Sequence, residues 1–285
     1  MLSIKTHHDV LISPWGEIFD IKGNLISIPK HSRCTDKSLD VTQVNIQQTP
    51  VGVYYDCIHR FGMHVWGHFR EVMARFYYYR HEISKHDRVL ISRAHRIHPD
   101  EHINHFNTFD VDSEMLVYIP RIDNTYYHIS TLKTVDWIPL YNNTEVISFM
   151  RDTWIHKKLP VKSKPIKLYL KRDGVRGIKN DHEVNEFLRD EGFTFFTGDE
   201  GFEQHIDMFF NAEIVIGAHG AAFFNTLFCE PSTNIKEFVP ITRRVDMWMN
   251  QSHSIGNHNH ELVEVECSHD FKLNISIKLL SKYIS

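Results

Sequence analysis

The stretch AEIVIGAHGAAFFNTLFCEP, residues 212–231, indicates more about the fold of this 285-residue chain than any other segment. Its apolar beginning predicts a short buried strand at 214–216. A turn of small residues follows, and after it comes an apolar run suited to a helix. Such a strand–turn–helix aims backbone N–H groups and the positive helix end at a ligand above the strand, usually a phosphate. His219 lies inside the turn and adds a side chain with chemistry of its own.

The turn supplies the first candidate binding residues. We expect a phosphate group to contact Gly217, Ala218, His219, Gly220 and Ala221.

Two polar residues lie close downstream of the turn. Asn225 follows in an apolar helix, where it either ties down the turn by hydrogen bonds or contacts the ligand. Glu237 lies in a strand of β-branched and aromatic residues, where a carboxylate needs a partner. The two vicinal hydroxyls of a ribose would be such a partner; exposure at a strand end is the alternative.

A basic loop, KRDGVRGIKN at 171–180, follows a predicted strand. Arg172 and Arg176 are its strongest candidates for binding a diphosphate, because guanidinium groups pair with phosphate oxygens in a bidentate manner. The alternative is a solvated basic loop. Asn180 and Glu183 have the spacing of a helix-capping pair and are expected to be structural.

Composition restricts the classes of protein that the chain can belong to. It is 42% hydrophobic and 24% charged, which is typical of a globular protein, and its net charge of −4 argues against binding nucleic acid by bulk electrostatics. No run of 18 apolar residues and no secretory signal stand out, so we expect no membrane insertion and a cytoplasmic location. The 4 cysteines form no Cys-x-x-Cys pair, and the 21 histidines are scattered. We therefore expect no dedicated metal site.

The order of predicted elements indicates an α/β protein of two domains. Strands alternate with helices in both halves, which favours parallel sheets covered on both faces and ligands bound at the carboxyl ends of the strands. We place the domains at 1–155 and 160–262, with a helix at 146–158 linking the halves and LPVKSKP at 159–165 as the linker. The C-terminal segment 265–285 is expected to form a helix that packs on the first domain.

The first domain offers candidates for acid–base chemistry. His64, His68 and Glu71 recur with Arg75 on one face of a predicted helix. A histidine beside a carboxylate is suited to act as a general base, although a polar surface face is the alternative. Asp110-Val111-Asp112 forms an Asp-x-Asp, a triplet that some sugar transferases use with a metal ion.

Together these residues resemble glycosyltransferase family 61. The resemblance rests on the Gly-Ala-His-Gly-Ala element with its downstream Asn and Phe-Cys-x-Pro, on the Gly-Phe and FEQ at 201–204, and on Arg172-x-x-x-Arg176-x-x-x-Asn180. It covers about 166–240. Upstream, His64 coincides with the histidine of a family pattern, whereas Phe61 and His68 replace its Asn and Asp. The base could therefore be His64, Glu71, Asp56 or His68.

The resemblance implies a GT-B-like fold, in which two Rossmann-like domains face each other across a cleft. It implies an inverting transfer from a UDP-sugar, bound by the C-terminal domain, to a hydroxyl of a glycan acceptor, with no obligatory metal or other cofactor. Xylose is the first expectation for the sugar and N-acetylglucosamine the second, in a bacterial or viral glycan-building enzyme. A non-catalytic two-lobed binding protein and a metal-dependent Asp-x-Asp transferase remain as alternatives.

Overall fold

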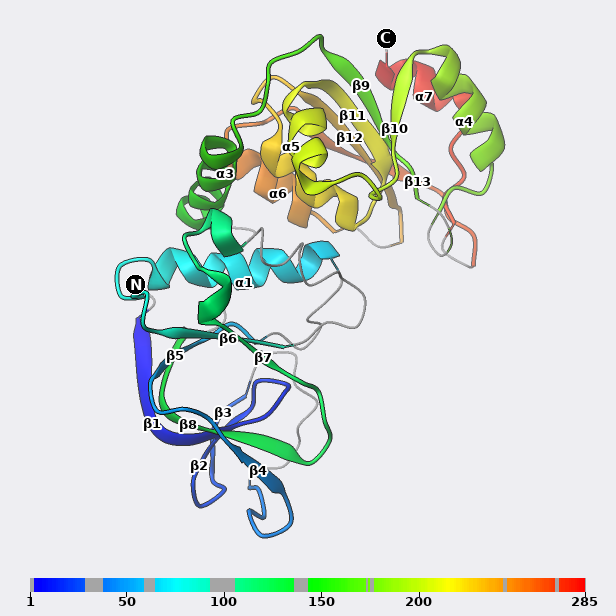
Figure 1. Ribbon diagram of the computed structural model, residues 1–285. Coiled ribbons are helices and arrows are strands. Elements are labelled where there is room, and N and C mark those ends of the chain that lie inside the picture. The colour runs from blue at the N-terminus through cyan, green and yellow to red at the C-terminus, as the bar shows by residue number, and fades with distance from the viewer. Residues whose placement is uncertain are drawn as a thin grey trace. The chain divides into compact units, whose positions relative to one another are not determined.

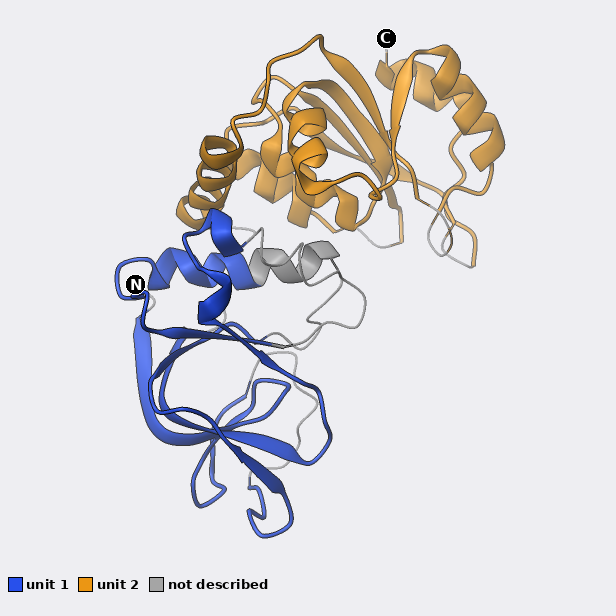
Figure 2. Ribbon diagram, viewed as in Figure 1, with its two compact units in different colours: residues 1–140 blue, residues 141–285 orange. Residues whose placement is uncertain are grey.

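The structure is a computed structural model that describes residues 3–28, 38–58, 65–92, 106–135, 143–172, 174, 177–242, 245–269 and 272–284, with the backbone alone for 65–71 and 92. The chain forms two compact units, Met1–Leu140 and Tyr141–Ser285 (Figure 2). Each has its own sheet and helices (Figure 1).

The first unit is built on a mixed sheet in the order β3-β2-β1-β8-β5-β6-β7, with β4 also paired to β8. Its elements are β1 (Ile4–Ile12), β2 (Ile18–Asp20), β3 (Leu25–Ser27), β4 (Asn45–Gln48), β5 (Val53–Asp56), α1 (Val65–Tyr79), β6 (Arg88–Ser92), the 3-10 helix η1 (Ser113–Met115), β7 (Leu116–Ile119) and β8 (Thr125–Val135). On α1, Val72, Met73 and Phe76 are buried.

This first sheet differs from the Rossmann-like sheet that the sequence analysis expects. β1 pairs antiparallel with both β2 and β8, whereas β5, β6 and β7 form parallel pairs. The reason is the short turn between β1 and β2, which contains Gly16 at a φ of 90°. A short turn joins antiparallel neighbours, while parallel neighbours need a longer crossover.

The second unit contains a five-stranded sheet in the order β10-β9-β11-β12-β13, and every pair in it is parallel. Its elements are α3 (Thr144–Lys158), β9 (Ile166–Leu170), α4 (Asp181–Asp190), β10 (Phe193–Phe196), α5 (Phe202–Phe210), β11 (Ala212–Ala218), the 3-10 helix η3 (Ala221–Phe228), β12 (Asn234–Pro240), α6 (Met247–Ser254), β13 (His260–Val265) and α7 (Ile277–Ile284). The parallel α/β prediction for this unit is confirmed.

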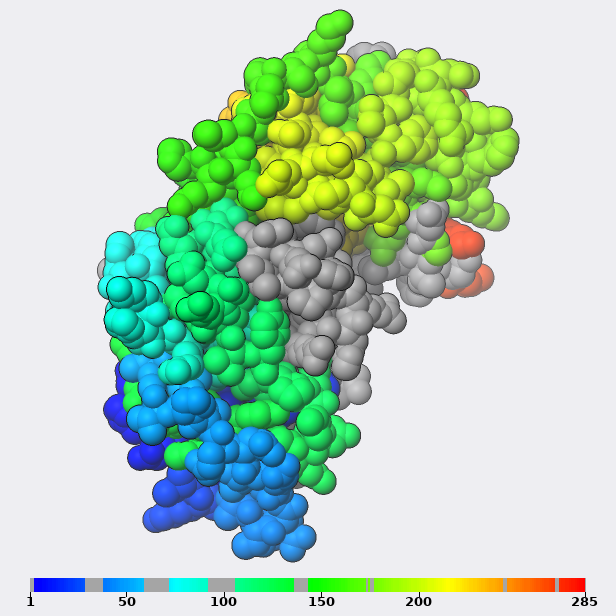
Figure 3. All heavy atoms as spheres, in the orientation of Figure 1, coloured from blue at the N-terminus to red at the C-terminus, as the bar shows by residue number. Residues whose placement is uncertain are grey.

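Helices cover both faces of the second sheet. On one face, Val184 and Leu188 of α4 and Leu280 of α7 pack with Ile216 and Phe238. The other face carries α5, η3 and α6, with α3 against them. The space-filling view in Figure 3 shows atoms of the segment with β10 and α5 in yellow-green and yellow.

Two expected domain assignments are corrected by this packing. Trp154 of α3 contacts Phe202 and Phe228 with ring centroids 5.8 Å apart in each case, so α3 belongs to the second unit and does not link the halves. Helix α7, expected with the first domain, belongs to the second unit and packs with α4.

The expected partners Asn180 and Glu183 do meet, since Nδ2 of Asn180 donates to Oε2 of Glu183 at 3.0 Å, but Asn180 also has a partner that the sequence does not indicate. Asn180 stands at the N-cap of α4, and its amide bonds the backbone of Ile275 on both sides. Its role is structural, as predicted, but it fastens the chain before α7 to α4.

Candidate active site

The histidine turn lies at the carboxyl end of β11, next to the carboxyl end of β9. A Cβ atom on Gly217 would lie 2.8 Å from the Cβ of Leu170 and 2.9 Å from its carbonyl oxygen. The turn therefore needs glycine at this position because β9 approaches so closely. After the turn, Phe223 N–H is the first to bond back, to the Gly220 carbonyl at 3.1 Å, and η3 begins.

Arg172 lies over this turn. Its Nη1 donates a hydrogen bond to the His219 carbonyl at 2.5 Å. A Cβ on Gly220 would lie only 2.0 Å from the same nitrogen, so the guanidinium occupies the space that a side chain would take. The other predicted arginine, Arg176, lies outside the described residues.

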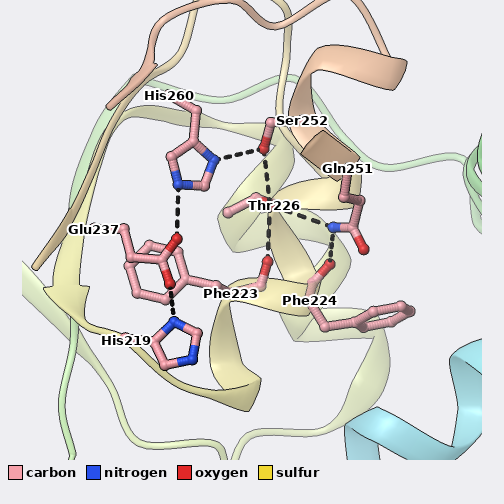
Figure 4. A network of polar contacts seen from close by, with 8 residues as sticks. All are labelled: His219, Phe223, Phe224, Thr226, Glu237, Gln251, Ser252 and His260. Atoms are coloured by element: carbon pink, nitrogen blue, oxygen red, sulfur yellow. Dashed lines mark hydrogen bonds and ion pairs between the residues drawn. The ribbon is translucent and has the colours of Figure 1, made fainter. Parts of the chain in front are cut away.

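Glu237 holds the imidazole of His219. The two side chains approach on the η3 face of the sheet, with Oε1 of Glu237 at 2.5 Å from Nδ1 of His219. A carboxylate accepts hydrogen bonds, so Nδ1 carries the proton and Nε2 is the nitrogen left for other partners. Figure 4 shows Nε2 turned away from Glu237. The His219 side chain keeps 16% exposure, whereas that of Glu237 has none.

A second imidazole binds the other oxygen of Glu237. His260, at the start of β13, places Nε2 at 3.1 Å from Oε2 of Glu237 and Nδ1 at 2.8 Å from the Ser252 hydroxyl (Figure 4). Ser252 lies 3.2 Å from the Thr226 hydroxyl, which Gln251 also contacts at 3.4 Å. All of these side chains beyond His219 are buried.

These contacts change the interpretation of Glu237. The ribose contact expected from the sequence has no support in this geometry, because both carboxylate oxygens face imidazoles and the residue is fully buried. The sequence indicates that Glu237 needs a partner, but His260, Ser252 and Gln251 are not predicted as members of its hydrogen-bond network. The only signal for His260 is the alternation in HELVEV, which puts it on the face of β13 opposite to Val263 and Val265.

The remaining residues of the turn have structural surroundings. Asn225 is fully buried and its amide donates to the Ala222 carbonyl at 3.1 Å, which supports the first turn of η3. Its Oδ1 has no hydrogen-bond partner in the part of the chain that the structure describes. Ala218 is buried, whereas Ala221 is exposed at the start of η3.

A family comparison gives these residues their context. A family model described as Glycosyltransferase 61 matches residues 51–236, which is more than half of the chain. The chain belongs to glycosyltransferase family 61. It is therefore a glycosyltransferase, an enzyme that transfers sugar. No curated protein matches the chain.

The family match ends directly before Glu237. Arg172 and His219 lie within the matched residues, while Glu237, Ser252 and His260 follow it. The buried partners of the turn histidine thus come from the part of this glycosyltransferase beyond the family match.

Of the catalytic candidates in the first unit, only Asp56 has a side chain that the structure describes. His64 lies outside the described residues, and for His68 and Glu71 the structure gives only their place on α1. Asp56 is described, and its carboxylate binds the Arg75 guanidinium at 2.7 Å and the backbone N–H of Ile58 at 2.9 Å. Burial is the largest single influence and lowers the pKa of Arg75, but the charge and hydrogen bond of Asp56 together with the neighbouring Tyr79 and Cys57 outweigh it, and the net pKa is raised. Asp56 is thus a poor candidate for a base, because it is already paired with a cation.

The described residues show no sign of a metal site, a reactive buried thiol or a membrane-spanning helix. Asp110 and Asp112 are exposed on either side of buried Val111, and the described residues hold no group of three or more His, Cys, Asp or Glu side chains that could bind a metal ion. Burial raises the pKa of the Cys57 and Cys229 thiols, which keeps both protonated. Within the described ranges, no helix is long and apolar enough to cross a membrane.

Proposed function

We propose that this glycosyltransferase binds a UDP-sugar at the carboxyl ends of β9 and β11 and transfers its sugar to a hydroxyl of a glycan. The observation that carries the proposal is the meeting of Arg172 and His219 at this place, with the guanidinium 2.5 Å from the His219 carbonyl. The strand order β10-β9-β11 reverses between β9 and β11, and ligands of doubly wound sheets bind at such a switch point.

The diphosphate of the UDP-sugar would accept hydrogen bonds from three kinds of group. Arg172 supplies a guanidinium fork that pairs with phosphate oxygens. His219 supplies Nε2, once that nitrogen carries a proton. The N–H groups of Gly220, Ala221 and Ala222 precede the first bond of η3 and have the orientation of a helix start. The N–H of His219 is not among them, since it donates to the Phe238 carbonyl at 2.8 Å.

The proposed transfer inverts the anomeric carbon. The acceptor oxygen forms a bond to that carbon, while the bond from the carbon to the β-phosphate oxygen breaks and its electron pair leaves with UDP. Negative charge therefore grows on the phosphate oxygen, and fixed donors there stabilise the transition state more than the ground state. The proton of the acceptor hydroxyl passes to a base, for which His64, His68 and Glu71 of the first unit remain the candidates.

The finer parts of the proposal follow from the family resemblance. We propose xylose as the first choice of sugar and N-acetylglucosamine as the second, with a GT-B arrangement of the two units and no obligatory metal. Activity that persists in EDTA would support the metal-free mechanism, whereas loss of activity that Mn²⁺ restores would favour the Asp110–Asp112 alternative.

Thermal unfolding with and without UDP tests the donor site. Millimolar UDP is expected to raise the midpoint of the wild-type protein, and a purine diphosphate much less, because ligands that bind only the folded state stabilise it. Arg172→Lys keeps the charge but loses the fork, so it should show a smaller shift. Arg189→Ala, on the outer helix α4, serves as the matched control and should keep the full shift. No shift in the wild-type protein would contradict the proposal.

A further inference from the structure

A chain of buried hydrogen bonds leads from Glu237 through three side chains to the backbone carbonyl of Phe223. Its contacts are Glu237 to His260 at 3.1 Å, His260 to Ser252 at 2.8 Å, and Ser252 to Thr226 at 3.2 Å. The Thr226 hydroxyl is also 2.8 Å from the Phe223 carbonyl (Figure 4). Every one of these side chains is buried, so the protons along the line have to be supplied by the protein itself.

The direction of each hydrogen bond can be assigned from the carbonyl end. A carbonyl only accepts, so Thr226 donates its single hydroxyl proton to Phe223. The bond between Thr226 and Ser252 then needs the proton of Ser252. Gln251 fits the same assignment, because its amide nitrogen donates to the Phe224 carbonyl at 2.9 Å and also points at the Thr226 oxygen.

Because the Ser252 hydroxyl donates its single proton to Thr226, its oxygen can only accept a hydrogen bond from His260. Nδ1 of His260 must therefore carry a proton. The other nitrogen, Nε2, faces the carboxylate of Glu237, which accepts when it is ionised. A proton on Nε2 is therefore needed for the hydrogen bond between His260 and Glu237. His260 then carries protons on both ring nitrogens and is a cation beside a buried anion, the arrangement that makes a buried charge tolerable.

We propose that His260 is the positioning residue of the turn histidine: a buried imidazolium that balances Glu237 and so fixes His219 with Nδ1 bonded to Glu237 and Nε2 presented to the donor. The inference rests on the proposed function for its consequence at the donor. Because the charge of Glu237 is already balanced from the buried side, a proton taken up by His219 at Nε2 gives the site a net positive charge. That charge faces the diphosphate of the donor.

The protonation of His260 can be measured directly in the whole protein without any ligand. Nitrogen-15 NMR of histidine-labelled protein, with the His260 signals assigned by their absence in His260→Gln, should show a bonded proton on both ring nitrogens. An unprotonated ring nitrogen on His260 would overturn the proposal. The answer is read from the wild-type protein, and His260→Gln serves only for the assignment; if that variant folds poorly, His260→Asn serves instead.

The consequence for the donor is measured with UDP as the probe. We expect His260→Gln to raise the Kd for UDP about tenfold or more, since outer partners of metal-ligating histidines are worth about 10–100-fold. His258→Gln is the matched control, because His258 is exposed two residues away and contacts His253 rather than Glu237. It should bind UDP like the wild type.

The outcomes separate the inference from the function on which it rests. Wild-type affinity in a folded His260→Gln would overturn the positioning role while leaving the UDP site intact. Failure of the wild-type protein itself to bind UDP would instead reject the proposed donor site, and the role of His260 with it. Equal losses of UDP affinity in His260→Gln and His258→Gln would also contradict the inference, because the loss would then not depend on contact with Glu237.

Discussion

At the scale of single residues, the site depends on two glycines that are required for different reasons. A Cβ on Gly217 would meet the backbone oxygen and Cβ of Leu170, which the sheet holds in place. A Cβ on Gly220 would meet the far end of the flexible Arg172 side chain instead. The first contact concerns the fold and the second concerns the position of a proposed donor-binding group.

Substituting alanine at each position should separate these two roles. Gly217→Ala is expected to lower the free energy of unfolding by about 1–3 kcal/mol, the usual cost of overpacking. Gly220→Ala should cost less stability, because the guanidinium can move, but that movement breaks its bond to the His219 carbonyl. Sugar transfer by Gly220→Ala should therefore fall more than its stability does.

Denaturant unfolding and turnover of both variants check this prediction. A Gly220→Ala protein with wild-type turnover would show that the place of Arg172 over the turn is unimportant. A Gly217→Ala protein with unchanged stability would show that β9 and β11 can move apart at little cost.

At the scale of elements, α3 is the helix whose place differs most from the expectation. Its Trp154 is fully buried against Phe202, Phe224 and Phe228. We expect Trp154→Ala to lower the free energy of unfolding by about 3–5 kcal/mol, as for other large aromatic residues in cores. His156→Ala, on the exposed side of the same helix, should change it by no more than about 0.5 kcal/mol. Equal small effects would indicate that α3 is a linker after all.

Helix α5 contributes a pH dependence through His205. Its ring lies 4.8 Å from that of Phe196, and burial lowers its pKa from 6.5 to about 4, against the opposing charge of Glu200. The folded protein thus resists protonation that the unfolded chain accepts. Stability from this histidine is complete above pH 6.5 and is lost as the pH falls toward 4, by up to about 3 kcal/mol.

Unfolding measured between pH 7 and pH 4 tests the role of His205. His205→Gln should flatten the part of the curve that His205 produces. His182→Gln, which replaces an exposed histidine on α4, should leave the curve unchanged. A wild-type pH dependence that survives in His205→Gln would assign it to other groups.

How far the sequence predicts these elements depends on how apolar they are. Helix α4 can be recognised in the sequence, because Val184 and Leu188 recur at helical spacing between the cap residue Asn180 and Gly192. The end of helix α6 and the loop before β13 give no such signal, since the run from Ser252 to His260 is largely polar. That polar run is where the buried partners of Glu237 lie. Their burial depends on strands far apart in sequence, which local patterns do not record.

At the scale of the whole molecule, the chain consists of a mixed-sheet unit and a parallel-sheet unit. The proposed donor site lies within the second unit, where Arg172 and His219 follow β9 and β11 and Glu237 lies in β12. Of the proposed bases, His68 and Glu71 belong to α1 of the first unit, and His64 lies outside the described residues. Family membership explains why the molecule is a glycosyltransferase, while the geometry of the second unit is the reason for placing the donor there.

A crystal structure of the protein with UDP tests this account most directly. We predict the diphosphate within hydrogen-bond distance of Nε2 of His219 and of the Arg172 guanidinium, with Glu237 still bonded to Nδ1. A nucleotide bound away from the carboxyl ends of β9 and β11, or one that leaves Nε2 of His219 without a phosphate contact, would contradict it.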